Sequence, residues 1–326
     1  MFDSRQKLGD YLGVNPQDLV YFPNPTTAVN MVARSLNLKP GDEILTTNHE
    51  YGAMDRIWRF ICRKTGACYH IQPIEAPVTS AEKLIEEFFS GATIRTKVIF
   101  ISHITSPTAL IFPVQTICKI AREMGILTIV DGAHAPGQVD LDLKAIDADI
   151  YVGACHKWLC APKGSAFLYA NPLIQDSLEP LIVSWGFESE NPGDSRFIDY
   201  HEWQGTRDLA AFLSVPAAIE FQRNHNWSLL RQHCHELASA ARSRINTLTN
   251  CPPLSPDSDF WFSQMVSMFL PKPAKPEFLQ SILHDQYNIE IPLFFWNDTP
   301  LMRISIQIYN HSEQIDYLAS VLSSLL

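Results

Sequence analysis

The stretch ILTIVDGAHAPGQVDLDLKAIDADIYVGACHK, residues 126–157, holds two short apolar runs that each lead into residues capable of chemistry. Residues 126–130 lead into Asp131, and residues 150–153 lead toward Lys157. Apolar runs of this length, bounded by Gly and Asp, are typical of buried strands. Ligands of open α/β sheets bind at the carboxyl ends of the strands. The stretch therefore predicts an acid and an amine at the ligand-binding edge of a sheet.

An acid and a lysine in these positions suit pyridoxal 5'-phosphate (PLP), which needs a lysine for its Schiff base and an acid that keeps its pyridine nitrogen protonated. Lys157 and Asp131 would supply these groups, and a displaced Lys157 amine can act as a general base on the α-proton of a substrate. His134 can hydrogen-bond the ring hydroxyl group, and His156 can reach the phosphate. Lys163, in a turn between two expected strands, is a poorer candidate for the Schiff base. Each residue alone is more typical of a capped turn or a solvated surface, and only the combination favours the cofactor.

Strand-like runs alternate with helical segments of about ten residues through the first two thirds of the chain. This alternation predicts an α/β fold whose large domain is a doubly wound, mostly parallel sheet. The expected strands cover residues 19–22, 44–47, 71–74, 97–102, 126–130, 150–153 and 165–169, and the expected helices cover residues 28–36, 54–62, 81–89, 114–124 and 209–223.

The pattern changes near residue 226. A long helix is expected at residues 227–247, a strand at residues 301–306 and a C-terminal helix at residues 310–324, with Asn310 and Glu313 as its capping pair. We therefore expect a large PLP-binding domain (residues 15–225), a small C-terminal α/β domain (residues 226–326) and a partial N-terminal helix (residues 1–14).

Two further segments reach the same sheet edge. Thr26 and Thr27 lie at or near the start of an expected helix, where backbone N–H groups and hydroxyls can bind a phosphate. Taken alone, two threonines before a helix are more typical of plain helix capping. Tyr51 follows the expected strand at residues 44–47 and can stack on a cofactor ring, or it can simply pack at the surface.

Composition excludes several classes of protein. The 326 residues carry a formal net charge of −10 with no Lys/Arg cluster, which argues against a nucleic-acid surface. No apolar run reaches the roughly 18 residues of a membrane-spanning helix, and the first residues lack the apolar core of a signal peptide. Seven cysteines without a CxxC motif argue against a disulfide framework or a zinc site. We expect a cytoplasmic protein with reduced thiols and no metal.

Five motifs together resemble the class V aminotransferase family of fold-type I PLP-dependent enzymes. Within that family, the chain is similar to the group of isopenicillin N epimerase and its relatives, over nearly its whole length. The motifs are DGAHAPG (residues 131–137), HKW (156–158), HEYGA (49–53), QGTRD (204–208) and RISIQIYN (303–310).

The resemblance implies PLP as the cofactor and a homodimer with shared active sites. It implies Lys157 as the Schiff-base lysine, Asp131 on the pyridine nitrogen, His134 on the ring oxygen, Thr26, Thr27 and His156 around the phosphate, and Tyr51 stacked on the ring. It further implies that Thr206 reaches the phosphate of the neighbouring subunit and that Arg303 binds the α-carboxylate of the substrate. Ser106 occupies the position of an Asn that lies near the ring in many relatives.

The departures from the family bear on the reaction. Cysteine desulfurases of this family carry a nucleophilic Cys shortly before the late arginine, but residues 290–298 contain none. Ala154 stands where many relatives have a phosphate-binding Ser, and the chain begins only about 20 residues before the strand that precedes the phosphate site. The preferred hypothesis is an epimerase-like isomerase acting at the α-carbon of an amino acid or amino-acid-containing small molecule. A cysteine C–S lyase, an aminotransferase, and a non-catalytic dimeric relative with weak or no PLP binding are the alternatives.

Overall fold

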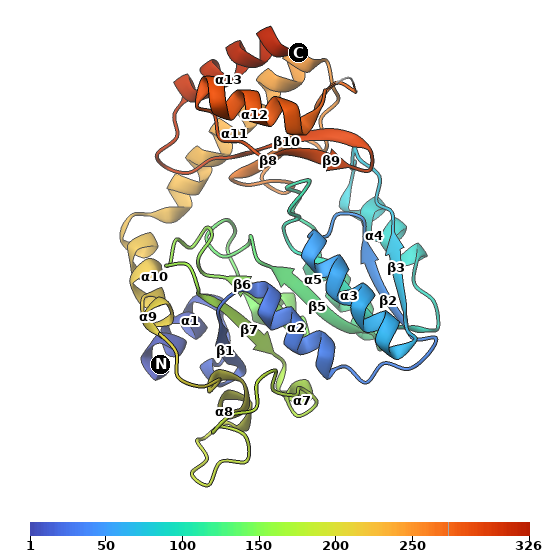
Figure 1. Ribbon diagram of the computed structural model, residues 1–326, viewed down its shortest axis with the longest axis vertical. Helices are drawn as coiled ribbons and strands as arrows, with labels where there is room; N and C mark the ends of the chain where they lie inside the picture. Colours follow the sequence, from blue (N-terminus) through green and yellow to red (C-terminus); the bar gives the residue numbers. More distant parts are fainter. Residues whose placement is uncertain (273) are drawn as a thin grey trace. The chain divides into compact units, whose positions relative to one another are not determined.

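The computed structural model describes residues 1–272 and 274–326. Its contacts divide the chain into two compact units, each with its own sheet (Figure 1). No helix in the described residues is long and apolar enough to cross a membrane. Unit 1 comprises Met1–Pro73, Ile85–Ile104 and Pro113–Asn224, and unit 2 comprises Ile74–Leu84, Thr105–Phe112 and His225–Leu326.

Unit 2 includes two segments that the sequence placed in the large domain, residues 74–84 and 105–112. Backbone hydrogen bonds attach both to the C-terminal part of the chain. The Val78 N–H donates to the Leu254 carbonyl at 2.9 Å, and the Ile111 N–H donates to the Trp261 carbonyl at 2.8 Å. The domain boundary predicted near residue 225 therefore misses these two segments. Hydrogen bonds between residues far apart in the chain leave no local sequence pattern from which the segments could be predicted.

A seven-stranded sheet forms the centre of unit 1, in the order β1-β7-β6-β5-β4-β2-β3. The pairs from β6 to β3 are parallel, whereas β7 is antiparallel to both of its neighbours. The mostly parallel α/β fold expected from the sequence is therefore confirmed. The strands are β1 (Leu19–Phe22), β2 (Glu43–Thr47), β3 (Cys68–Gln72), β4 (Thr96–Ser102), β5 (Leu127–Gly132), β6 (Ile150–Ala154) and β7 (Ala166–Ala170).

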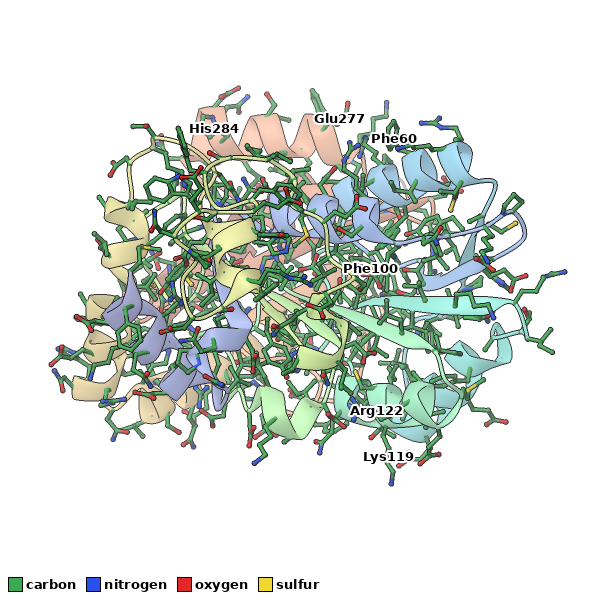
Figure 2. All side chains as sticks on the ribbon, turned by 90° about the horizontal axis from the view of Figure 1, so that it is seen from below. Phe60, Phe100, Lys119, Arg122, Glu277 and His284 are labelled. Atoms are coloured by element: carbon green, nitrogen blue, oxygen red, sulfur yellow. The ribbon has the colours of Figure 1, made fainter. Side chains whose placement is uncertain are left out.

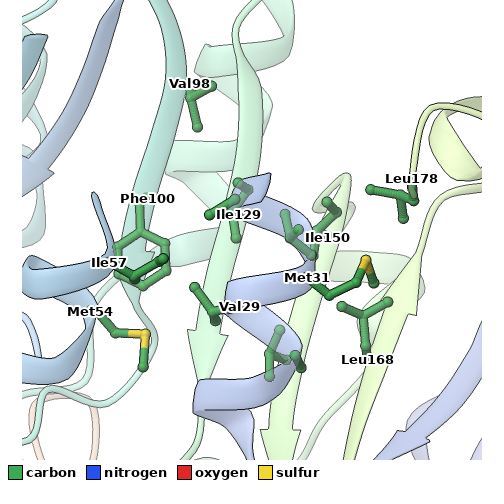
Figure 3. Close-up of a cluster of buried hydrophobic side chains, with 14 of the residues drawn as sticks. Val29, Met31, Met54, Ile57, Val98, Phe100, Ile129, Ile150, Leu168 and Leu178 are labelled. Carbon is green, nitrogen blue, oxygen red and sulfur yellow. The ribbon is translucent and has the colours of Figure 1, made fainter. Parts of the chain in front are cut away.

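Helices cover both faces of this sheet (Figures 1 and 2). On one face, α2 (Pro25–Ser35) and α3 (Gly52–Thr65) bury apolar side chains against the strands. Figure 3 shows Val29 and Met31 of α2 and Ile57 of α3 packed over Phe100 and neighbouring strand residues. Figure 2 shows α5 (Val114–Glu123), with Lys119 and Arg122 on its outer side, across the sheet from α3. Apolar strands with helices on both sides are what a buried parallel sheet requires.

The remaining helices of unit 1 extend the two layers. Arg122 of α5 forms an ion pair with Asp147, the residue that ends α6. These helices are α1 (Phe2–Leu12), the 3₁₀ helix η1 (Pro16–Asp18), α4 (Ala81–Ser90, which crosses the boundary between the units), α6 (Leu143–Ile146), α7 (Pro172–Gln175), α8 (Arg196–Glu202), α9 (Ala210–Leu213) and α10 (Val215–Asn224).

Unit 2 contains an antiparallel three-stranded sheet in the order β8-β10-β9. Leu254, Trp296 and Leu301 form a small buried cluster in this unit. Its elements are α11 (Trp227–Thr249), β8 (Met265–Phe269), α12 (Pro276–Tyr287), β9 (Leu293–Trp296), β10 (Thr299–Ser305) and α13 (Ser312–Leu325).

The capping pair expected for the C-terminal helix, Asn310 with Glu313, is wrong. His311 caps α13, and the capping box joins His311 with Gln314. Asn310 instead accepts a 2.8 Å hydrogen bond from the Gln307 N–H at its Oδ1 and donates to Gln314 Oε1 at 2.9 Å. The helix therefore begins at Ser312, later than expected, because Asn310 closes the preceding turn.

Candidate active site

The sheet of unit 1 brings the candidate residues to one edge. β1 is antiparallel to β7, which is antiparallel to β6, so β1 points the same way as the parallel strands. The carboxyl ends of β1, β2, β4, β5 and β6 therefore lie at the same edge. The residues that directly follow or end these strands include Thr26 and Thr27 after β1, Tyr51 after β2, Asp131 and His134 at β5, and His156 and Lys157 after β6.

Asp131 is a buried carboxyl group near the end of β5. Its Oδ1 atom accepts a 3.0 Å hydrogen bond from the Ala133 N–H. Burial raises the pKa of Asp131, and a positive charge on Lys157 and the Ala133 N–H lower it in part. A buried carboxylate is stable only with a donor or a cation beside it. A protonated pyridine nitrogen would supply such a partner.

Lys157, His134 and Trp158 form a chain of contacts beside this acid. Lys157 Nζ lies 3.1 Å from His134 Nε2, and the Trp158 indole N–H donates to His134 Nδ1 at 3.2 Å. An indole nitrogen can only donate, so Nδ1 is the acceptor and the ring proton of neutral His134 lies on Nε2. Nε2 can then donate to Lys157 only if the lysine amine is neutral. This arrangement favours the nucleophilic form of Lys157.

Gly137 allows the two motifs of the site to pack against one another. Its φ is +88°, a left-handed conformation that L side chains rarely adopt. A Cβ atom at this position would lie 2.3 Å from the carbonyl oxygen of Trp158. The DGAHAPG segment can therefore approach the HKW segment only with glycine at residue 137, and this approach places His134 beside Lys157.

At the start of α2, where the sequence predicts a phosphate site, Asn24 is the capping residue. Asn24 Oδ1 accepts hydrogen bonds from the Thr27 N–H at 2.8 Å and from the Thr27 hydroxyl at 3.0 Å. The Thr26 N–H and hydroxyl have no hydrogen-bond partner in the described part of the chain. Pro25 has no N–H, so Thr26 is the first residue of α2 that presents an amide donor at this end of the helix dipole.

His156 is oriented by the strand that follows it. Its Nδ1 atom lies 2.6 Å from the carbonyl oxygen of Ser165 and therefore carries a proton that it donates. Burial lowers the pKa of His156, and nearby Lys157 and Lys163 add to the effect, whereas the Ser165 carbonyl opposes it. With Nδ1 engaged in this way, Nε2 is the atom left to face a phosphate oxygen, to which it can donate when His156 is protonated.

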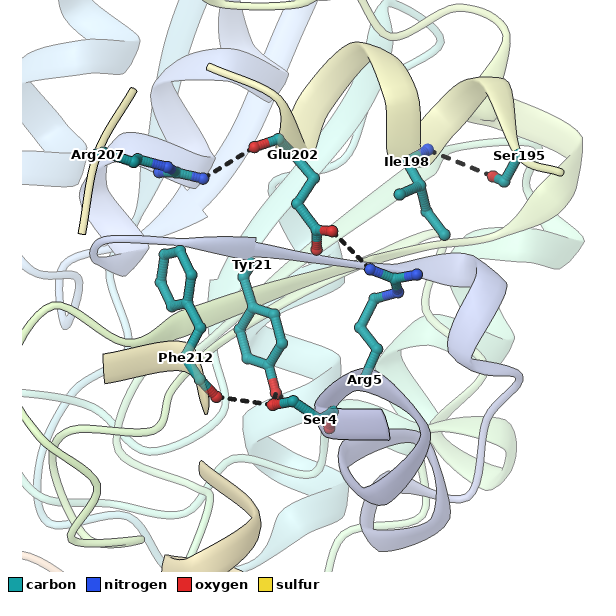
Figure 4. A network of polar contacts seen from close by, with 8 residues as sticks. All are labelled: Ser4, Arg5, Tyr21, Ser195, Ile198, Glu202, Arg207 and Phe212. Carbon is teal, nitrogen blue, oxygen red and sulfur yellow. Dashed lines mark hydrogen bonds and ion pairs between the residues drawn. The ribbon is translucent and has the colours of Figure 1, made fainter. Parts of the chain in front are cut away.

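Tyr51 and Thr206 lie at the surface of unit 1. Tyr51 directly precedes α3, and its side chain is 49% exposed, which leaves a ring face available for stacking. Thr206 is exposed in the loop after α8. Figure 4 shows how this loop is fixed: Arg207 donates to the Glu202 carbonyl at 2.9 Å, and Glu202 forms an ion pair of 2.5 Å with Arg5 of α1.

Arg303 and Ser106 both belong to unit 2. Arg303 lies in β10, and its Nη1 donates to the Ser106 carbonyl at 2.5 Å and to Ser106 Oγ at 3.2 Å. Its Nε–H is buried without a hydrogen-bond partner, and among the described residues no carboxylate forms an ion pair with its guanidinium. Burial lowers the pKa of Arg303. Ser106, expected near the cofactor ring, contacts Arg303 here.

The sequence interpretation missed three residues that shape the site: Asn24, Trp158 and Gly137. Asn24 was recognisable as the polar residue before Pro25, the arrangement that usually starts a helix. Trp158 was visible only as part of the HKW motif, because its contact with His134 depends on how two loops fold.

Among the described residues, no group of His, Cys, Asp and Glu could hold a metal ion.

The donor set fits PLP: a buried acid for the ring nitrogen, a lysine held next to a histidine, and a helix start for the phosphate. The fold and this site define a PLP-dependent enzyme of fold type I. The chain belongs to the class V aminotransferase family, because the family model for aminotransferase class-V matches residues 1–318. Its cofactor is therefore PLP.

Curated relatives cover the whole chain. The isopenicillin N epimerase of Amycolatopsis lactamdurans is 36% identical over 338 residues, and that of Streptomyces clavuligerus is 34% identical over 339 residues. These alignments cover 100% of this chain and 85% and 84% of the two relatives. A probable chloroplastic L-cysteine desulfhydrase of Arabidopsis thaliana is 28% identical, with 99% of this chain and 74% of the relative covered.

Solved structures share the fold. An apo cysteine desulfurase from Thermococcus onnurineus NA1 superposes with a TM-score of 0.84 at 21% identity, covering 99% of this chain and 82% of that one. The cystine C–S lyase C-DES, in complex with its product cysteine persulfide, also gives 0.84, at 20% identity, with 98% and 85% covered. A mutant of this lyase with glycine covalently linked to its PLP cofactor gives 0.81, at 21% identity, with 98% and 84% covered.

Proposed function

We propose that this enzyme removes and returns the α-proton of an amino acid or an amino-acid-containing small molecule, in an epimerase-like reaction. The observation that carries the proposal is the position of Lys157, whose amine lies 3.1 Å from His134 Nε2 at the same sheet edge as Asp131. Bound PLP supplies an electron sink that stabilises negative charge at the substrate α-carbon. Lys157 is the base that takes the proton, and Asp131 holds the positive charge of the ring nitrogen.

Arg303 is proposed to bind the substrate carboxylate. Its buried Nε–H has no hydrogen-bond partner in the part of the chain that the structure describes, and a carboxylate that accepted hydrogen bonds from Nε and an adjacent Nη would satisfy it. Ser106 holds the other side of the guanidinium through Nη1, which fixes its plane. A lysine at residue 303 could not reproduce this fork.

Epimerisation is favoured over cysteine chemistry by two observations. The relatives named isopenicillin N epimerase are 34–36% identical over the full chain, whereas the probable L-cysteine desulfhydrase is 28% identical. The segment 290–298 also has no cysteine that could accept a sulfur atom, which argues against the persulfide chemistry of a cysteine desulfurase. Inversion needs a second acid or base on the opposite face of the α-carbon, and Tyr51 is the candidate donor. A cysteine C–S lyase is the second candidate, supported by the desulfhydrase relatives.

A homodimer with shared active sites is proposed as the working form. Several large apolar side chains near the Thr206 loop are exposed, which is typical of an association surface. They include Val183 at 67% exposed, Trp185 at 85% and Trp203 at 53%. Thr206 of one subunit would then bind the cofactor phosphate of the other.

A cytoplasmic location is also proposed. It is supported by the seven cysteines, none of which forms a disulfide bond among the described residues. Free thiols without disulfide partners are typical of reducing compartments.

A solvent-exchange experiment tests the reaction. The PLP-loaded enzyme is incubated in D₂O with a panel of L- and D-amino acids, and loss of the α-proton is followed by NMR together with chiral analysis. Exchange with inversion supports the epimerase, whereas release of pyruvate with sulfide or a thiol supports the lyase. Lys157→Ala should abolish exchange. If the wild-type protein gains no visible absorption band after PLP is added, the proposed reaction is refuted, and the non-catalytic relative becomes the supported hypothesis.

A further inference from the structure

A buried carboxyl group, Glu50, lies beside the candidate site without a role in the chemistry above. Its two oxygens are hydrogen-bonded to different strands. The Thr47 hydroxyl at the end of β2 donates to Oε1 at 2.8 Å, and Ser102 Oγ at the end of β4 lies 2.6 Å from Oε2. All three side chains are buried. The carboxyl group therefore links the carboxyl ends of β2 and β4.

This link spans the point where the strand order changes direction. The chain runs from β2 through α3 to β3, which is the neighbour of β2 on one side. It runs from β4 through α5 to β5, which is the neighbour of β4 on the other side. The two connections leave in opposite directions, so the β2 and β4 ends flank the crevice in which doubly wound sheets bind ligands. Thr47 also accepts a 3.2 Å hydrogen bond from the His49 N–H, which orients its hydroxyl toward Glu50.

The residues on either side of the link are those assigned to the cofactor ring. Glu50 directly precedes Tyr51, the stacking residue. Ser102 is the register partner of Asp131 in the parallel pairing of β4 with β5. A change in the position of Glu50 would therefore be transmitted to the ring face through Tyr51 and to the ring nitrogen through Asp131.

We propose that Glu50 is a positioning residue for PLP, whose hydrogen bonds to Thr47 and Ser102 hold Tyr51 and Asp131 at the spacing that the pyridine ring requires. The proposal deepens the function above and rests on PLP binding at this edge. A displacement of about 1 Å in such supporting residues is enough to impair a preorganised site. Glu50 itself does not contact the reacting atoms.

The electrostatic surroundings agree with a neutral, hydrogen-bonding role. Burial raises the pKa of Glu50 to about 8, the hydroxyls of Ser102 and Thr47 oppose the rise, and the charges of Asp131 and Asp55 add to it. Tyr69 of β3 also faces this group. A neutral Glu50 leaves Asp131 as the carboxylate that meets the pyridinium ion, without a second negative charge competing for it.

Glu43 provides a matched control at the opposite end of the same strand. It is also buried, and it is held by Thr93 at 2.5 Å and by Arg95 at 2.7 Å. Loss of either carboxyl group should destabilise β2, but only Glu50 lies at the ligand-binding edge. Comparison of the two separates a cofactor effect from a general loss of stability.

The test measures the PLP dissociation constant and the melting temperature of Glu50→Ala, Glu50→Gln, Ser102→Ala and Glu43→Ala. Glu50→Ala should weaken PLP binding by at least about tenfold. Glu50→Gln, whose amide oxygen can accept from one hydroxyl while its NH2 group donates to the other, should weaken it by less than about threefold. Ser102→Ala should give an intermediate loss. Glu43→Ala should lower the melting temperature and leave PLP binding within about threefold of wild type.

A second readout follows the pH dependence of the apo-protein. The pKa of Glu50 is raised by folding, so its stabilising contribution is lost as pH rises toward about 8. The melting temperature of wild type should therefore fall relative to Glu50→Gln between about pH 5 and about pH 8. Equal PLP affinity in Glu50→Ala and Glu43→Ala would overturn the proposal. If Glu50→Ala does not fold, Ser102→Ala replaces it, and a wild-type PLP affinity in Ser102→Ala would overturn the proposal. Absence of PLP binding by the wild type would instead refute the cofactor site itself.

Discussion

Trp158 determines where the protons lie between His134 and Lys157. Its indole N–H occupies His134 Nδ1, which leaves the ring proton on Nε2, facing the lysine amine. Without this donor, His134 can place its proton on Nδ1 and accept a hydrogen bond from a charged ammonium group. The indole of Trp158 thus favours a neutral, reactive Lys157 over a charged one.

Trp158→Phe tests this point because it keeps an aromatic ring and removes the N–H. The rate at which added PLP acquires its visible absorption should fall by about tenfold at about pH 7, because His134 no longer favours the neutral amine of Lys157. Stopped-flow absorbance measures this rate. Trp58→Phe is the control, since the buried indole N–H of Trp58 has no hydrogen-bond partner among the described residues. An equal decrease in both variants would contradict the explanation.

His103 imposes a pH dependence on stability. Its Nδ1 lies 2.8 Å from Tyr151 Oη, and burial lowers its pKa to about 4. Between the ordinary His pKa and this value, the unfolded chain binds a proton that the folded chain does not, so stability is lost as pH falls from about 6.5 to about 4.

His103→Gln should flatten this acid limb. The difference in unfolding free energy between wild type and variant should change by about 3 kcal/mol over that pH interval. Urea unfolding of the apo-protein at intervals from about pH 4 to about pH 7 measures it. His201→Gln is an internal comparison, because burial also lowers the pKa of His201 to about 4. Parallel curves for wild type and His103→Gln would show that His103 is already protonated in the folded chain.

At the scale of elements, we expect the start of α2 to couple helix stability to phosphate binding. Asn24 satisfies the Thr27 N–H and orients the Thr27 hydroxyl, while Thr26 retains its donors for a ligand. Asn24→Ala should cost about 1 kcal/mol in unfolding free energy. It should also weaken PLP binding, because the first turn no longer holds its threonines in place.

Asn171→Ala is a suitable control for this prediction. Asn171 caps the short helix α7 in the same way, accepting a 3.0 Å hydrogen bond from the Leu173 N–H, but it follows β7, which runs opposite to the parallel strands. The control should lose similar stability and bind PLP normally. Titration of PLP against both variants, combined with chemical unfolding, distinguishes the two effects. Equal PLP affinity in both would remove the phosphate-binding role of the α2 start.

Elements were predictable where the apolar pattern was strong. The expected strand at residues 97–102 and the strand ending before Asp131 correspond to β4 and β5, since buried parallel strands read as continuous apolar runs. The antiparallel direction of β7 was not visible, because strand direction depends on a partner elsewhere in the chain. Likewise, the cap of α13 moved to His311, since several polar residues in succession offer alternative caps.

At the scale of the whole molecule, the sequence predicted positions at the strand ends better than the connections between distant segments. Asp131, His134 and Lys157 could be placed at one sheet edge because they lie within or just after two successive strands. The excursions at residues 74–84 and 105–112 into unit 2 could not, because they depend on hydrogen bonds to residues far along the chain, such as the bond joining Val78 to Leu254. Ser106 lies in one of these excursions, which explains why its contact with Arg303 was not expected.

The proposed sharing of active sites between subunits can be tested by mixing two inactive chains. Lys157→Ala removes the lysine, and Thr206→Asp places a negative charge where the partner's phosphate would bind, so neither homodimer should hold PLP covalently. In a mixed dimer, one site combines the intact Lys157 of one chain with the intact Thr206 of the other. Random reassociation of equal amounts should therefore restore about a quarter of the wild-type sites. The restored sites are measured by the amount of PLP that borohydride fixes to the protein and by the rate of α-proton exchange. Light scattering checks that dimers form. A mixture that regains no sites, although mixed dimers form, would place Thr206 and Lys157 in the same subunit's site or remove Thr206 from it.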